Sequence, residues 1–185
     1  MQAGQLVVAT PLLQDPNFAR TVVLLLQADT EDGALGVVLN RPTGTDLGEV
    51  LSDWEPLAGE PAVVFTGGPM QPNAAICLGR ARVGGVLTGA YSPVENAPTV
   101  GTVDLEATPE ELRGAVSEVR IFAGYAGWET GQLEAEVEEG AWWVLDALPS
   151  DPFSSQPGQL WQAVLRRQGP PVSFAALYPP DPTLN

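Results

Sequence analysis

Apolar runs of strand length, separated by turn-forming residues, make up the pattern of the first half of the chain. Three of them read QLVVAT (residues 5–10), TVVLLLQ (residues 21–27) and ALGVVL (residues 34–39). Such continuous runs are typical of buried strands. The polar residues 29–33 between the second and third runs predict a hairpin at the centre of a sheet.

Weaker strand signals follow. One predicted helix comes before them in the sequence and another comes after them. Short strands are predicted at residues 62–65 and 73–78, around residues 86–87, and at residues 100–105. Apolar spacing predicts a short helix over residues 46–51, with Thr45 as its N-cap. The sequence TPEE (residues 108–111) combines an N-cap, a proline and an acid in the order that starts a helix. We expect that helix to continue along an apolar stripe of Leu112, Ala115, Val116 and Val119.

Residues 120–136 hold the densest mixture of glycine and aromatic residues in the chain. Ile121 and Phe122 predict the end of a buried strand, and the glycines that follow predict a turn beneath the rings of Tyr125 and Trp128. Residues 132–139 suit a helix or an alternating strand, and the glycine stop at residue 140 favours the helix. A strand over residues 141–148 and a last helix over residues 158–168 complete the predicted elements.

Strands come early in this pattern, whereas helices come late and singly. We therefore predict an α+β fold with a mixed or antiparallel sheet, because a parallel α/β fold needs regular strand–helix alternation. The 185 residues suffice for one domain with a real core.

Charge narrows the range of partners. The chain carries 23 acidic side chains against eight cationic ones, and its net charge is −15. Proteins bind nucleic acids largely through cations that displace phosphate counterions, so direct nucleic-acid binding is not expected. Anionic membrane surfaces are excluded for the same reason, and no apolar run is long enough to span a bilayer. The first residues carry no positive charge or cleavage site of a signal peptide, so a cytoplasmic location is expected.

The absence of histidine removes several kinds of catalytic and metal site. There is no imidazole for a Ser-His-Asp or Cys-His arrangement or for metal ligation. The lone Cys77 lies in an alternating strand, where a buried structural thiol is expected rather than a nucleophile. We predict no catalytic residue, no metal and no cofactor.

Three separated motifs give the chain a family resemblance. With LNRP (residues 39–42), TGGP (residues 66–69) and the stretch at residues 120–136 in this order, the sequence resembles the YqgE/AlgH family of small bacterial proteins. The resemblance covers residues 4 to about 169. It implies a sheet-rich core curled into barrel-like lobes and flanked by a few short helices. On this basis residues 1–169 form one domain, and residues 170–185 form a proline-rich tail with a mobile end.

The same motifs supply the candidate ligand-binding residues. Glycine amides after a strand can bind an anion, and an arginine beside them can add a bidentate contact. The alternative is a packing junction, in which the glycines serve a turn and Arg41 has a protein partner. We expect the motifs to lie close together under either interpretation. The candidate residues are Asn40, Arg41, Thr66, Gly67, Gly68, Pro69, Tyr125, Trp128 and Gln132.

Three classes of function stay open. We predict a non-catalytic interaction or regulatory protein that acts through a protein partner, with any effect on transcription indirect. The first alternative is a domain that binds a small molecule or anion. The second is a hydrolase that works without histidine.

Overall fold

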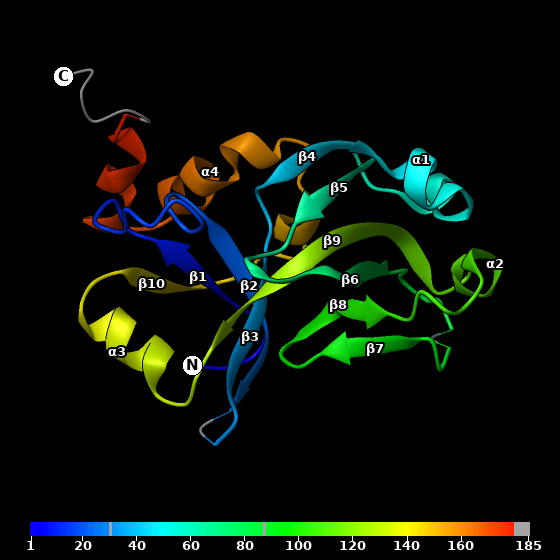
Figure 1. Ribbon diagram of the computed structural model, residues 1–185, viewed down its shortest axis with the longest axis horizontal. Helices are drawn as coiled ribbons and strands as arrows, with labels where there is room; N and C mark the ends of the chain where they lie inside the picture. Colours follow the sequence, from blue (N-terminus) through cyan, green and yellow to red (C-terminus); the bar gives the residue numbers. More distant parts are fainter. Residues whose placement is uncertain (30, 87, 180–185) are drawn as a thin grey trace.

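Ten strands form one sheet in the computed structural model, which describes residues 1–29, 31–86 and 88–179 (Figure 1). Eight short helical segments accompany them in this part of the chain, four of them 3-10 helices (η). The strands are β1 (Gln5–Ala9), β2 (Val22–Asp29), β3 (Gly33–Val38), β4 (Pro42–Asp46), β5 (Val63–Thr66), β6 (Met70–Ala81), β7 (Tyr91–Val94), β8 (Ala97–Val103), β9 (Val116–Trp128) and β10 (Trp142–Asp146). The helical segments are α1 (Leu47–Val50), η1 (Ser52–Leu57), α2 (Pro109–Leu112), α3 (Gln132–Glu138), η2 (Asp151–Phe153), η3 (Pro157–Gln159), α4 (Leu160–Arg166) and η4 (Val172–Leu177).

The sheet confirms the predicted α+β class. Its strand order is β10-β1-β2-β3-β9-β6-β8-β7, and β4 and β5 attach beside β9. All strand pairs are antiparallel except β5 with β9, so the sheet is mixed. None of the described helices is both long and apolar enough to cross a membrane.

The sheet does not close into a barrel. The ordered path ends at β10 and β7, and no described strand pairing joins these two ends. Instead, the tip of the β7–β8 hairpin reaches back to the start of the chain. There the Asn96 side chain donates a hydrogen bond to the Ala3 carbonyl over 3.3 Å. Beside this contact, no described strand pairing joins β7 to β2 or β3, and we call this open line the seam of the sheet.

Strand β9 is the element on which the two halves of the sheet meet. It pairs with β6 along one edge and with β5 and β3 along the other (Figure 1). Two predictions are wrong here. The helix that begins at Pro109 stops at Leu112, and Val116 and Val119 belong to β9. The predicted glycine turn is also absent, because β9 continues through Gly124 and Gly127 to Trp128.

Most of the other predicted elements are present with shifted ends. The helix at residues 132–139 is confirmed as α3, and the last helix as η3 with α4. Asp46 rather than Thr45 caps α1, accepting a hydrogen bond from the Gly48 amide. Strand β6 begins at Met70, and β7 was not predicted. Of the strand expected at residues 86–87, Val86 lies in no strand and Leu87 is outside the described residues.

Buried side chains form clusters on both faces of the sheet. The largest lies between the sheet and α4 and includes Leu24, Phe65, Phe122 and Trp161. A second lies under α1, η1 and α2, and a third lies under α3. The last helix is further held by the Trp161 indole, which donates to the Ala9 carbonyl over 2.8 Å.

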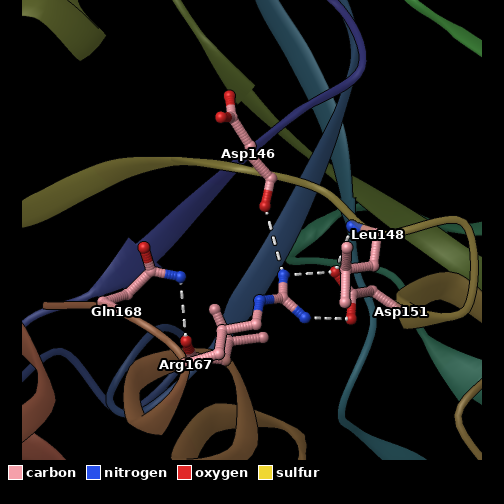
Figure 2. A network of polar contacts seen from close by, with 6 residues as sticks. Asp146, Leu148, Asp151, Arg167 and Gln168 are labelled. Carbon is pink, nitrogen blue, oxygen red and sulfur yellow. Dashed lines mark hydrogen bonds and ion pairs between the residues drawn. The ribbon is translucent and has the colours of Figure 1, made fainter.

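An ion pair joins the carboxyl end of α4 to η2, and a hydrogen bond joins it to β10 (Figure 2). The Arg167 guanidinium donates to both carboxylate oxygens of Asp151, over 2.7 and 2.6 Å, and to the Asp146 carbonyl over 3.1 Å. Asp151 is buried and also accepts from the Leu148 amide. Beyond α4 the chain forms η4, and Arg20 donates to the carbonyls of Tyr178 and Pro179. The end of the tail that was expected to be mobile, residues 180–185, lies outside the described residues.

Arg120 in β9 is a buried cation held by backbone carbonyls. Only 2% of this residue is exposed. Its guanidinium donates to the Glu60 carbonyl over 2.6 Å and to the carbonyls of Pro152 and Ser154 over 3.1 Å each, and it lies 4.4 Å from the centre of the Phe65 ring. Burial lowers the pKa of this guanidinium to about 10, so it stays charged at neutral pH.

Candidate functional site

Asn40 and Arg41, between β3 and β4, bond to residues 19–22, where the chain enters β2. The Asn40 side chain donates to the Arg20 carbonyl over 2.9 Å and accepts from the Val22 amide over 3.0 Å. Arg41 donates to the Ala19 carbonyl over 2.7 Å while its side chain lies at the surface. Both residues thus have the protein partners expected of a packing junction.

The glycine motif packs directly against β9. The Gly67 amide donates to the Ala123 carbonyl, and its carbonyl accepts from the Val38 amide, each over 2.8 Å. A side chain at Gly68 would collide with the Tyr125 backbone. The expected proximity of the three motifs is therefore observed, and it arises from close backbone packing.

A shallow hollow of about 260 Å³ lies over this junction. Arg41, Thr66, Gly68 and Pro69 line it, together with Pro16 and Asn17. The amides of Thr66 and Gly67 are already bonded to the Arg41 and Ala123 carbonyls. Arg41 is the only cationic residue in the lining, and the ligand-binding role of these residues stays a prediction.

Trp128 belongs to an aromatic cluster beneath α3. Its ring stacks on Phe18 and meets Trp142 edge-on, at centroid distances of 6.1 and 5.8 Å. Both indole N–H groups donate to the same Glu136 oxygen, over 3.1 Å from Trp128 and 2.8 Å from Trp142. Gln132 donates to the other oxygen of Glu136 over 2.8 Å. Sequence reasoning missed Glu136, because one acid among several on a helix is normally solvated.

A larger hollow, which Tyr125 lines, lies between β2, β3 and β7 along the seam of the sheet. Its volume is about 820 Å³, and a second hollow of about 430 Å³ adjoins it. The two share wall residues from β2, β3 and β7, and we call them together the seam groove. The shared residues are Leu26, Gln27, Leu35 and Pro93.

Apolar side chains line much of the seam groove, and acids surround one end. Met70 and Tyr125 lie in the larger hollow, and Ile76 and Val94 in the smaller one. Every carboxylate in the lining belongs to the larger hollow, and no arginine lines either hollow. We call these four exposed residues the acidic end: Asp29, Asp32, Glu95 and Glu129.

The candidate residues therefore divide between two places. Arg41, Thr66, Gly68 and Pro69 line the shallow hollow, whereas Tyr125, Trp128 and Gln132 line the seam groove. Asn40 and Gly67 line neither and serve the packing junction. The acidic end was missed, since its members come from three turns far apart in sequence. Only residues 29–33 carry a local signal, which is that of a hairpin turn.

The groups near the groove offer little for covalent or metal chemistry. Cys77 borders the smaller hollow, but burial raises the pKa of its thiol to about 12, so almost no thiolate is present at neutral pH. Within the described residues no group of three or more Cys, Asp or Glu side chains could hold a metal ion. What the groove does offer is apolar surface next to unneutralised negative charge.

Comparisons with known proteins agree with this architecture. The model of a family described as AlgH-like matches residues 6–173. A UPF0301 protein of Streptomyces coelicolor is 55% identical, over 98% of this chain and 94% of its own length. A UPF0301 protein of Mycobacterium tuberculosis is 44% identical, over 100% of this chain and 91% of its own.

Two solved structures share the fold. The crystal structure of a Corynebacterium diphtheriae protein superposes with a TM-score of 0.87 at 32% identity, covering 96% of this chain and 93% of that one. The solution structure of AlgH from Pseudomonas aeruginosa gives a TM-score of 0.66 at 30% identity, covering 95% and 93%. The similarity thus extends over nearly the whole length of each chain.

Proposed function

Because the chain belongs to the AlgH-like family and offers a long open groove beside few reactive groups, we propose that it is a non-catalytic binding protein that holds a segment of a protein partner in the seam groove. The observation that carries this proposal is the groove itself. Its larger hollow has the size of a ligand site, and a second hollow extends it past β7. A regulatory effect, including one on transcription, would then pass through that partner.

The walls of the groove favour an extended chain over a compact small molecule. Strand β7 ends the sheet, so one of its edges has no neighbouring strand among the described residues, and Ser92, Pro93 and Val94 border the groove. Extended segments commonly dock beside such edges, with pockets that take alternate side chains. Apolar residues on both walls, such as Leu35 and Ile76, would supply those pockets.

Site-specific photo-crosslinking in living cells tests this proposal. Gln27 is exposed and lines both hollows, so benzoylphenylalanine at this position should give discrete adducts with a protein that mass spectrometry can identify. The same group at Ala163, an exposed position on α4, is the control. A bulky Ala75→Trp substitution in the smaller hollow should remove the Gln27 adducts. Adducts no stronger at Gln27 than at Ala163 would contradict the proposal.

A further inference from the structure

The charges of the seam groove identify the chemistry of its occupant more closely than its shape does. All ionisable carboxylates of the lining gather at one end, and the described ion pairs of the protein involve none of the four. No arginine occurs between residues 21 and 40 or between residues 121 and 165, which are the stretches that supply most of this end. The acidic end therefore has no ion-pair partner among the described residues, although Met1 lines a small neighbouring hollow together with Asp29.

The rest of the groove would suit an uncharged apolar segment. Leu26, Leu35 and Ile76 are half-buried in the free protein and line the smaller hollow. Tyr125, also half-buried, and the more exposed Met70 continue this apolar surface to the acidic end. An occupant that matches both parts has alternating apolar side chains and at least one cation.

We infer that the seam groove binds an extended segment of a partner protein that alternates apolar residues with arginine or lysine, its cation lying among Asp29, Asp32, Glu95 and Glu129. This inference rests on the proposed binding function and adds the partner's chemistry to it. Asp29 has a second task, since its carboxylate accepts hydrogen bonds from the amides of Glu31 and Asp32 within the hairpin turn. The other three acids are the ones whose charge can be removed without disturbing that turn.

Binding of a fluorescein-labelled heptapeptide tests the charge. One peptide alternates leucine with arginine, and the second has citrulline, which is neutral and nearly the same shape, in place of each arginine. An exposed charge pair contributes on the order of twofold to fivefold in affinity. Several such pairs predict that the arginine peptide binds at least about tenfold more tightly in 20 mM salt, and that this ratio falls at 500 mM salt.

Two matched charge variants distinguish the effect of the acids in the groove on peptide affinity from the effect of the protein's overall negative charge. The triple variant Asp32→Asn, Glu95→Gln, Glu129→Gln should bring the two peptides to within about threefold of each other. A control variant, Glu49→Gln, Asp53→Asn, Glu106→Gln, removes three exposed acids elsewhere, two of them in α1 and η1, and should keep the preference. Equal affinity for both peptides in the unmodified protein, equal losses in the two variants, or no binding of either peptide at 1 mM would overturn the inference.

The groove-filling variant distinguishes this inference from the function on which it rests. If Ala75→Trp abolishes binding of both peptides but arginine has no advantage, the groove binds chains and only the inference about charge fails. If Ala75→Trp changes nothing, the peptides bind elsewhere and both proposals fail. Spermidine that competes as tightly as the arginine peptide would make the groove a small-cation site and overturn the inference. Self-association that Ala75→Trp abolishes would make a second copy of this chain the occupant, with the same consequence.

Discussion

At the scale of single residues, the Glu136 carboxylate links two tryptophan side chains. One oxygen of Glu136 accepts from two indoles, which fixes both rings in the cluster with Phe18. Trp128 has only 6% of its surface exposed, as the surrounding glycines predicted, whereas Tyr125 is half-buried. These residues make α3 and β9 dependent on each other.

Removing the Trp128 ring should therefore destabilise the protein strongly. We expect Trp128→Ala to lower the free energy of unfolding by about 3–5 kcal/mol, since it opens a cavity and removes a buried hydrogen bond. Trp128→Phe, which keeps an aromatic ring but not the N–H group, should cost less. Urea denaturation measures both, and Phe174→Ala at an exposed site is the control. A loss below about 1 kcal/mol for Trp128→Ala would contradict this account.

Cys77 should be unreactive in the folded protein and reactive in the unfolded chain. Burial raises its pKa from 9.0 to about 12, so at pH 9 the folded state holds about five hundredfold less thiolate than the unfolded one. Iodoacetamide labelling at pH 9 should be far slower in buffer than in 6 M guanidinium. Between pH 9 and 12 the Cys77 thiol binds fewer protons in the unfolded chain than in the folded protein. Titration of this thiol therefore lowers the free energy of unfolding as pH rises. Comparable labelling rates in buffer and in guanidinium would contradict the burial of the Cys77 thiol.

At the scale of elements, the glycines of β9 allow two backbones to come close together. Gly124 has φ of +71°, and a Cβ atom there would lie 2.6 Å from the Gly68 carbonyl oxygen and 2.8 Å from that of Met70. The strand continues past this point with a bulge in its pairing with β6. The glycines thus belong to a strand junction and not to a turn.

Gly124→Ala should consequently be much more damaging than an alanine at an open glycine. The new methyl group meets two carbonyl oxygens, and the backbone conformation is one that alanine rarely adopts, so we expect a loss of about 2–4 kcal/mol. Gly114→Ala is the matched control, because nothing lies within 4 Å of its Cβ position. The midpoints of thermal unfolding of the two variants test this prediction, and equal midpoints would rule out the proposed close packing.

The elements that could be predicted from the sequence are those whose signal is local. Strands β1 to β3 are short apolar runs rich in β-branched residues and bounded by turn residues, a combination typical of buried strands. The helix start at Pro109 was also correctly placed, but capping residues do not determine where a helix ends. Val116 and Val119 fit a helical stripe equally well, and only their pairing with Ala81 and Gly79 on β6 makes them strand residues.

At the scale of the whole molecule, charge is distributed unevenly. Arg80 and Arg120 lie inward on the sheet, whereas the seam groove ends in exposed carboxylates. This groove could not be predicted, because a curled sheet that stays open brings together residues from positions as distant as Asp29, Glu95 and Glu129. Tyr125, Trp128 and Gln132, which the glycine and aromatic pattern singles out, line this groove, and their ligand-binding role stays a prediction.

The overall charge predicts that the protein does not bind duplex DNA. At a net charge of −15, without a cationic surface to displace phosphate counterions, we expect no mobility shift of a random duplex at 150 mM salt with 10 µM protein. The Arg166-Arg167 pair does not change this, since Arg167 is engaged by Asp151. A shift at sub-micromolar protein would show that a cationic surface has been overlooked.

The buried guanidinium of Arg120 also has a consequence for how the protein opens. Its three acceptors, at Glu60, Pro152 and Ser154, come from two segments about 90 residues apart, and β9 supplies the cation itself. Detaching either segment leaves a buried positive charge short of acceptors, a state that costs several kcal/mol. Unfolding of one segment alone is therefore unfavourable, and we expect both segments and β9 to unfold together. In native-state hydrogen exchange, β9 and the residues flanking η2 should behave as a single cooperative unit, exchanging together and among the last in the molecule.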